Sequence, residues 1–280
     1  MSIHSTMFET LPIVEAELNY LAPGNTKPRT YTFDPPSNEP RTNVVNDTRK
    51  VPIRNARPVA TTLALDEEGF ELVHHHSALR DFYDEEEIKH VYYAEAEAIL
   101  KGATGADRVV IFDHTVRRRV PGAEDRRDAM RQPVARVHVD HTAKSGPQRV
   151  RDLLPAEADD LLRGRVQIIN LWRPIRGPLR DTPLAVCDAR TVKPEQLVPS
   201  ELVYPHRVGE TYSVTFDPAH RWFYVPEMQV DEGLLLKCYD SETDGRARFA
   251  PHTAFSDPTT PADAPPRESI EVRTLVFHRK

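Results

Sequence analysis

The stretch ARVHVDHTAKSG, residues 135–146, places His138 and Asp140 two positions apart, with Val139 between them. In an extended strand, residues at i and i+2 point to the same face, so this imidazole and this carboxylate reach the same point in space. Val139 then points the opposite way, into packing. The pattern predicts a β-strand that carries part of a metal site, with an ordinary polar strand end as the alternative.

Composition limits the class of protein. The 280 residues are 29% charged and 39% hydrophobic, which suits a globular protein of one large domain or two small ones. No apolar run approaches the ~18 residues of a membrane helix, and residues 1–21 lack a signal-peptide core, so no membrane partner is expected. The net charge is −6 and the basic residues are scattered, which argues against nucleic-acid binding. Two cysteines, Cys187 and Cys238, predict no disulfide framework and a cytoplasmic setting.

Most of the chain after residue 106 is strand-like. Short runs rich in β-branched or aromatic residues are bounded by proline, glycine or aspartate, and this pattern predicts strands. The runs favour a mainly β jelly roll or barrel, supported by helices. They cover residues 107–117, 134–142, 165–174, 182–190, 211–218, 221–228, 232–241 and 268–278.

Two helices are predicted before and between these strands. Asp84 is expected to cap a helix over 84–102 that Gly102 closes, with an apolar stripe against the sheet. The stripe comprises Ile88, Val91, Tyr92, Glu95 and Ile99. A shorter helix is expected over 155–164, beginning at Pro155. We expect a single domain, 1–280, in which residues 1–60 form an extended arm able to add edge strands at 31–33 and 44–53, and residues 61–280 form the β core with flanking helices.

A metal site needs a third ligand, and the candidate is His252. Two histidines and one carboxylate on one face leave three coordination positions open, the arrangement of non-haem Fe(II) oxygenases. A chelating co-substrate takes two of these positions and O2 takes the third. The tract His74–His76 is interpreted as a loop, because adjacent residues of a strand alternate faces and at most two of the three could share one ion.

The far carboxylate of such a co-substrate needs a cation. Arg267 and Ser269 lie two apart on the last predicted strand, after the second histidine, and an arginine fork beside a hydroxyl binds a carboxylate. Arg173 and Arg273 compete with Arg267 for this role, and Tyr212 is a weaker candidate. The order His-x-Asp, distant His, Arg-x-Ser is that of 2-oxoglutarate-dependent oxygenases.

Four long segments carry a resemblance to a known family: residues 81–117, 170–192, 220–241 and 251–277. They resemble the family of the cephalosporin 7-alpha-methoxylase J subunit, which includes fungal hydroxylase/desaturases and a meroterpenoid endoperoxide synthase. The similarity spans roughly residues 60 to 278. It implies a double-stranded β-helix that uses Fe(II), 2-oxoglutarate and O2, with ascorbate as an in vitro supplement. The positions that match for the metal are His138, Asp140 and His252, with Arg267 for the co-substrate.

The expected activity is oxidation of a C–H bond of a small secondary metabolite, by hydroxylation, desaturation, cyclisation or endoperoxidation. The substrate-pocket candidates are strand residues. They are interpreted first as core residues, and those that point inward would line the substrate cavity. They are Asn170, Trp172, Trp222 and Tyr224, with His114 beside them. The alternative function is a non-catalytic jelly roll that binds a ligand or serves as the accessory subunit of a two-component enzyme. A homodimer is left open as well.

Overall fold

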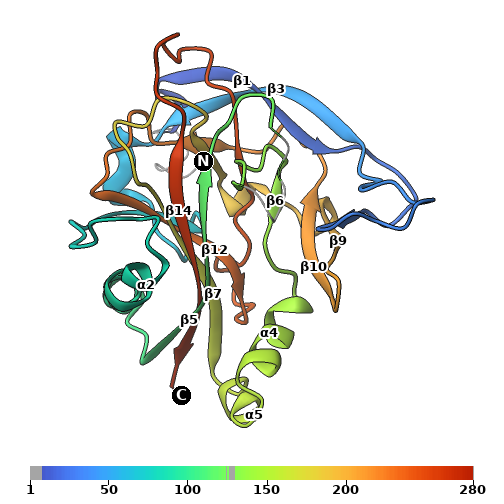
Figure 1. The fold of residues 1–280 in the computed structure, drawn as a ribbon, viewed down its shortest axis with the longest axis vertical. Helices are drawn as coiled ribbons and strands as arrows, with labels where there is room; N and C mark the ends of the chain where they lie inside the picture. The colour runs from blue at the N-terminus through green and yellow to red at the C-terminus, as the bar shows by residue number, and fades with distance from the viewer. Residues whose placement is uncertain (1–7, 124, 126–129, 280) are drawn as a thin grey trace.

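The computed structural model describes residues 8–123, 125 and 130–279. Its β content, 37% strand against 18% helix, confirms the mainly β prediction. The strands form two curled sheets, one of nine strands and one of five, with helices outside them (Figure 1).

The larger sheet contains the predicted metal-site segments in its middle. Its strands, in spatial order, are β1 (Ile13–Leu21), β3 (Asn46–Asn55), β11 (Trp222–Tyr224), β8 (Leu184–Cys187), β13 (His252–Ala254), β6 (His138–Val139), β10 (Val208–Val214), β9 (Leu197–Val203) and β2 (Arg29–Tyr31). The strand predicted over 134–142 is thus only two residues long. Residues 134–137 follow a different path, in which Asn19 binds the backbone at Ala135 and Val137.

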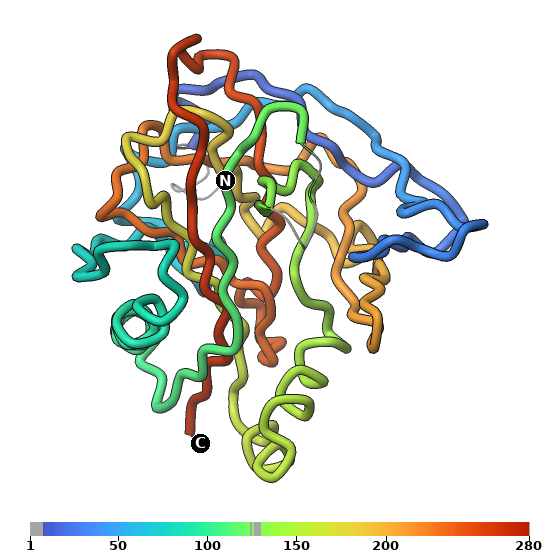
Figure 2. Tube along the Cα trace, in the orientation of Figure 1, coloured from blue at the N-terminus to red at the C-terminus, as the bar shows by residue number. Residues whose placement is uncertain are grey.

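Residues 13–55 supply strands at both ends of this sheet, and Figure 2 shows this part of the chain, in blue, across the top and right of the molecule. β1 and β3 form an antiparallel pair, and β3 joins β11 in parallel. β2 pairs with β9 at the opposite edge, close to the edge strand expected at 31–33. The strand expected at 44–53 corresponds to β3. It is not an edge strand, because β1 pairs with its outer edge.

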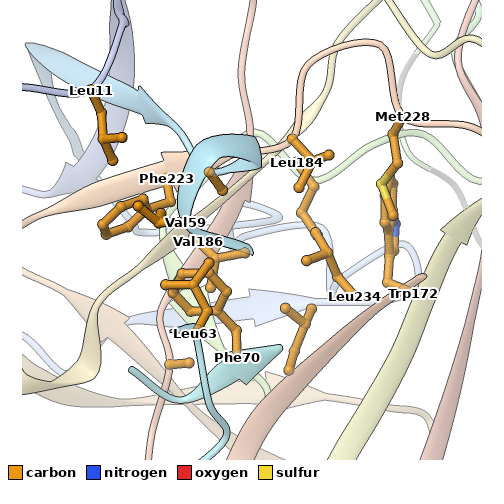
Figure 3. Packing of buried hydrophobic residues seen from close by; sticks show 14 of the residues in the cluster. Leu11, Val59, Leu63, Phe70, Trp172, Leu184, Val186, Phe223, Met228 and Leu234 are labelled. Atoms are coloured by element: carbon orange, nitrogen blue, oxygen red, sulfur yellow. The ribbon is translucent and has the colours of Figure 1, made fainter. Parts of the chain in front are cut away.

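The smaller sheet supplies the opposite wall. Its order is β4 (Phe70–His74), β12 (Glu232–Asp240), β7 (Arg165–Pro174), β14 (Glu268–His278) and β5 (Arg108–Arg118). The last strand of the chain, β14, lies between β7 and β5 and is antiparallel to both. Buried apolar residues from both sheets pack together between them, and Figure 3 shows Trp172 beside Met228 at the border of one such cluster.

The predicted helix over 84–102 forms but ends later. It consists of α2 (Glu85–Glu87), a π-helical turn η2 (Ile88–Tyr92) and α3 (Tyr93–Thr104). Asp84 caps it by accepting hydrogen bonds from the backbone of Glu86 and Glu87. Gly105, at φ 66°, closes it instead of Gly102, because Gly105 adopts the left-handed conformation that ends helices.

The apolar stripe of this helix is rotated relative to the expectation. Its fully buried residues are Ile88, Tyr92, Ala96 and Leu100, and they pack against the outer face of the smaller sheet. Val91 and Ile99 lie at the margin of the same cluster, half-buried.

The second predicted helix, over 155–164, is wrong in extent. Only α5 (Ala158–Leu161) forms there, and a longer helix, α4 (Ser145–Leu153), precedes it. The start of α4 is held by a reciprocal pair: the Ser145 hydroxyl accepts from the backbone of Thr142, and the Thr142 hydroxyl accepts from the backbone of Ser145. Gly146 and Pro147 hid this helix from the sequence pattern. Short 3₁₀ turns complete the chain: η1 (Arg57–Thr62), η3 (Ala189–Thr191) and η4 (Pro194–Gln196).

None of the helices in the described part of the chain has the length and apolar character needed to cross a bilayer.

Candidate metal centre

His138 and His252 come together because their strands are neighbours. β13 pairs with β6, and His252 lies directly opposite His138 in that register. Their ring centroids are 4.5 Å apart. Asp140 follows β6 on the same side, and one ligand atom from each of the three residues lies within 4.8 Å of the other two. Two strands far apart in sequence thus present two imidazoles and a carboxylate to one point.

Both histidines are oriented by backbone carbonyls. His138 Nδ1 donates to Arg136 O at 2.8 Å, and His252 Nδ1 donates to Ala250 O at 3.1 Å. A histidine that donates through Nδ1 keeps the lone pair of Nε2 free for a metal. Burial, and then the nearby His138, lower the pKa of His252, which favours the neutral, ligating form.

Asp140 is held through its second oxygen. Oδ2 accepts from Asn170 Nδ2 at 2.8 Å and from Arg273 Nε at 3.2 Å. Oδ1 lies 3.4 Å from His138 Nε2, on the side of the ligand cluster. Burial alone would raise the pKa of this carboxyl, but its contacts with His138 and Arg273 outweigh burial and hold the pKa well below its usual value. Asp140 is therefore ionised and free to ligate through Oδ1.

Arg267 and Ser269 lie at the start of β14, beside the same cavity. Arg267 is 2% exposed and lines the cavity together with His138, Asp140 and His252. Its Nε donates to Ser269 Oγ at 3.1 Å and its Nη1 to Thr182 O at 3.0 Å. The guanidinium also stacks over Trp172, 4.9 Å from the ring centroid. These contacts fix the fork without supplying a carboxylate partner.

The two competing arginines have other contacts. Arg273 lines the cavity, but it contacts Asp140 and also Glu271 at 2.7 Å. Arg173 lies on the opposite face of β7, where it donates to the carbonyls of His75 and Val230 and sits over Tyr92. The alternation of a strand explains this, since Trp172 faces the cavity and its neighbour must face the helix.

The weaker pocket candidates are dispersed. Trp172 lines the cavity, and Asn170 contacts two of its lining residues, Asp140 and Glu271. Trp222 is a core residue whose indole donates to Tyr20. His114 contacts Tyr93 and Glu85 on the helix side.

Two candidates lie against other parts of the fold. The hydroxyl of Tyr212 accepts from the backbone of Ala143. Tyr224 lines a separate pocket of about 340 Å³ with Pro183 and Asp257.

Two charged cavity residues were missed by the sequence patterns. Arg117 of β5 and Glu271 of β14 both line the cavity with the triad. Glu271 continues the alternation Arg267, Ser269, Glu271, so strand parity was a signal for it. Arg117 faces the cavity through its pairing with β14, and no local pattern indicates that pairing.

Comparison with known proteins finds relatives along most of the chain. Residues 18–277 match the family model described as oxidoreductase/YMDC permease-like domain. The hydroxylase/desaturase efuI of Hormonema carpetanum is 36% identical over 252 residues, 82% of this chain and 84% of that protein. The Fe(II)/2-oxoglutarate-dependent dioxygenase nvfI of Aspergillus novofumigatus is 33% identical over 94% of this chain and 96% of its own.

The solved structure of the iron and alpha-ketoglutarate-dependent endoperoxidase NvfI superposes with a TM-score of 0.86 at 30% identity, covering 96% of this chain and 99% of that one. The match confirms the double-stranded β-helix expected from the sequence.

Proposed function

Since the chain belongs to this oxidoreductase family, with fungal hydroxylase/desaturases and Fe(II)/2-oxoglutarate-dependent dioxygenases as relatives, we propose that it uses Fe(II), 2-oxoglutarate and O2 to oxidise a C–H bond of a small secondary metabolite. The observation that carries the proposal is the cluster of His138, Asp140 and His252 in one cavity. The reaction types named for the relatives, hydroxylation, desaturation and endoperoxidation, set the range of outcomes.

The donor set fits Fe(II). Two neutral imidazoles and one ionised carboxylate make the facial triad with open positions that non-haem iron oxygenases use. Each of the three side chains is oriented by a hydrogen bond on the side away from the metal. Backbone carbonyls orient the two histidines, and Asn170 and Arg273 orient Asp140. When bound, the iron supplies the dioxygen chemistry that couples decarboxylation of 2-oxoglutarate, to succinate and CO2, with oxidation of the substrate.

The protein's own part is to hold and orient the reactants. Arg267, fixed by Ser269 and Thr182, binds the far carboxylate of 2-oxoglutarate and so sets the position of its keto-acid end. Trp172 and Leu184 line the same cavity and give it an apolar wall that limits water. One chain supplies all of these groups, so a homodimer or a partner subunit would add no ligand.

We also propose that residues 1–280 act as one catalytic domain in a reducing, cytoplasmic setting. The pairing of β1–β3 and β2 with the larger sheet supports the first part, and the two buried, free thiols of Cys187 and Cys238 support the second.

The ligand assignment is tested with three histidine variants. His138→Ala and His252→Ala should lose Fe(II) binding and succinate formation and keep their circular dichroism spectra. His114→Ala is the control, because that ring contacts the helix instead of the cavity. Wild-type succinate production by both ligand variants would refute the assignment.

The assignment of Arg267 to the far carboxylate of 2-oxoglutarate is tested with two arginine variants. Arg267→Lys keeps the charge and loses the planar fork, so the 2-oxoglutarate concentration needed for half-saturation should rise about 10- to 150-fold, with Fe(II) affinity unchanged. Arg173→Lys, on the other face of β7, should leave that concentration unchanged. A rise of the half-saturating concentration in the Arg173 variant alone would show that Arg267 does not bind this carboxylate.

A further inference from the structure

Arg117 is a cavity residue to which the proposed function gives no role. It is 8% exposed and lines the same cavity as the triad and Arg267. The register of β5 and β14 places Arg117 directly opposite Ser269, the residue whose hydroxyl accepts from Arg267. Residues opposed in antiparallel strands have Cβ atoms about 4.5–5.5 Å apart on one face of the sheet. Arg117 therefore lies beside the Arg267–Ser269 pair.

Among the described residues, neither guanidinium has a carboxylate as its close partner. In the described part of the chain, no carboxylate lies within ion-pair distance of the Arg267 guanidinium. Asp181 accepts a hydrogen bond from the backbone N–H of Arg267, but its ion pair is with Arg119, at 3.1 Å. Arg117 has Asp125 at 3.8 Å, but two nitrogens of Arg131 hold that carboxylate at 2.8 and 3.0 Å. The close partner of Arg117 is a neutral acceptor, Gln132 O, at 2.7 Å.

Two like charges in one cavity destabilise each other. Burial, followed by the charge of Arg117, lowers the pKa of Arg267 to about 9. Glu271, the other acid of the cavity, is already paired with Arg273. An anion placed between the two guanidiniums would relieve this repulsion, and the four lone-pair positions of a carboxylate suffice for a hydrogen bond from each guanidinium and one from a hydroxyl.

We propose that Arg117 is a second arginine of the co-substrate site, and that it binds the distal carboxylate of 2-oxoglutarate together with Arg267 and Ser269. Because Ser269 accepts from Arg267, its own hydroxyl hydrogen is free to donate to the same carboxylate. This inference rests on the proposed function, since it assigns the residue to the site of that co-substrate.

The test compares two ligands that differ only in the distal carboxylate. 2-Oxoglutarate and 2-oxopentanoate are titrated anaerobically into the Fe(II)-loaded protein, and the visible charge-transfer band of the chelate reports binding. Arg117→Gln should weaken binding of 2-oxoglutarate about 10- to 150-fold and leave binding of 2-oxopentanoate unchanged. Arg117→Lys, which keeps the charge, should restore part of the loss.

The control is Arg118→Gln, the next residue of β5, which is half exposed and points away from the cavity toward Glu268. It should bind both ligands like the wild type. Equal weakening of both ligands by Arg117→Gln would overturn the proposal and indicate a purely structural role. Unchanged 2-oxoglutarate binding would also overturn it. A wild-type protein that binds no 2-oxoglutarate at all would instead refute the proposed function.

Discussion

Asn170 offers a test of how the candidate metal centre is held, because it contacts the site without belonging to the triad. Its side chain is fully buried, and Nδ2 donates to Asp140 Oδ2 at 2.8 Å and to Glu271 Oε1 at 3.0 Å. Asn170→Leu keeps the side-chain volume and removes both donors. Asp140 then keeps Arg273 as its one fixed partner on that oxygen.

The expected effect of Asn170→Leu follows from these contacts. A hydrogen bond to a charged group contributes about 1.5–3 kcal/mol. Loss of a partner that orients a metal ligand lowers metal affinity about 10- to 100-fold, which corresponds to about 1.4–2.7 kcal/mol. We therefore expect the Fe(II) dissociation constant to rise by that factor, with the co-substrate affinity of the loaded protein changing less.

The assay is anaerobic titration of Fe(II) against a chelator of known affinity. Thr274→Val is the matched control, because its buried hydroxyl donates to Ile169 O at 2.8 Å on the neighbouring strand, away from Asp140. That variant should lose about 1 kcal/mol of stability and keep its Fe(II) affinity. A folded Asn170→Leu protein with wild-type Fe(II) affinity would refute the reasoning, since the orientation of Asp140 would then be irrelevant to the metal.

Three further predictions concern stability. A Cβ on Gly146 of α4 would lie 2.6 Å from the Tyr239 ring, so Gly146→Ala should lower the free energy of unfolding by about 1–3 kcal/mol. A Cβ on Gly102 of α3 meets nothing within 4 Å, so Gly102→Ala should raise it by about 0.5–1 kcal/mol. Equal melting temperatures for the two variants would contradict this contrast. Burial lowers the pKa of His220 to about 4, so the unfolded state takes up this proton first as the pH falls and stability should decrease from about pH 6.5 to pH 4, by up to about 3 kcal/mol. His220→Gln should flatten that part of a pH series of thermal unfolding, and an unchanged slope would show that the ring titrates alike in the folded and unfolded states. Ile88→Asp should lower the free energy of unfolding in urea by more than about 3 kcal/mol, and Val91→Asp by less because Val91 is half-buried; the reverse order would mean that the other side of the helix faces the sheet.

The pairing of His138 with Asp140 could be predicted from the sequence because the strand alternation that places them together is local. The position of His252 beside them could be proposed only from its order in the chain, since β13 is three residues long and its pairing with β6 depends on the whole fold. Arg117 was not predicted, because it reaches the cavity through its register with β14, which also depends on the whole fold.

Some of the differences from the expectations could have been avoided with local rules. Arg173 follows Trp172, so the two could not both face the cavity, and parity alone separates them. Local rules could not have predicted that the helix ends at Gly105 instead of Gly102. Both glycines fit the pattern of a helix end, and only the backbone conformation distinguishes them. The helix at 145–153 was hidden because its stabilising contacts join Thr142 to Ser145 outside the apolar periodicity.

The central claim is that His138, Asp140 and His252 bind the metal and that Arg267 binds the co-substrate. Crystals grown anaerobically with Mn(II) in place of Fe(II) and with 2-oxoglutarate test it most directly, through the anomalous signal of the metal. The account predicts one strong peak between the Nε2 atoms of the two histidines and Oδ1 of Asp140, with the distal carboxylate of 2-oxoglutarate on Arg267. A metal peak at another place, such as the His74–His76 tract, or a co-substrate bound away from Arg267, would contradict it.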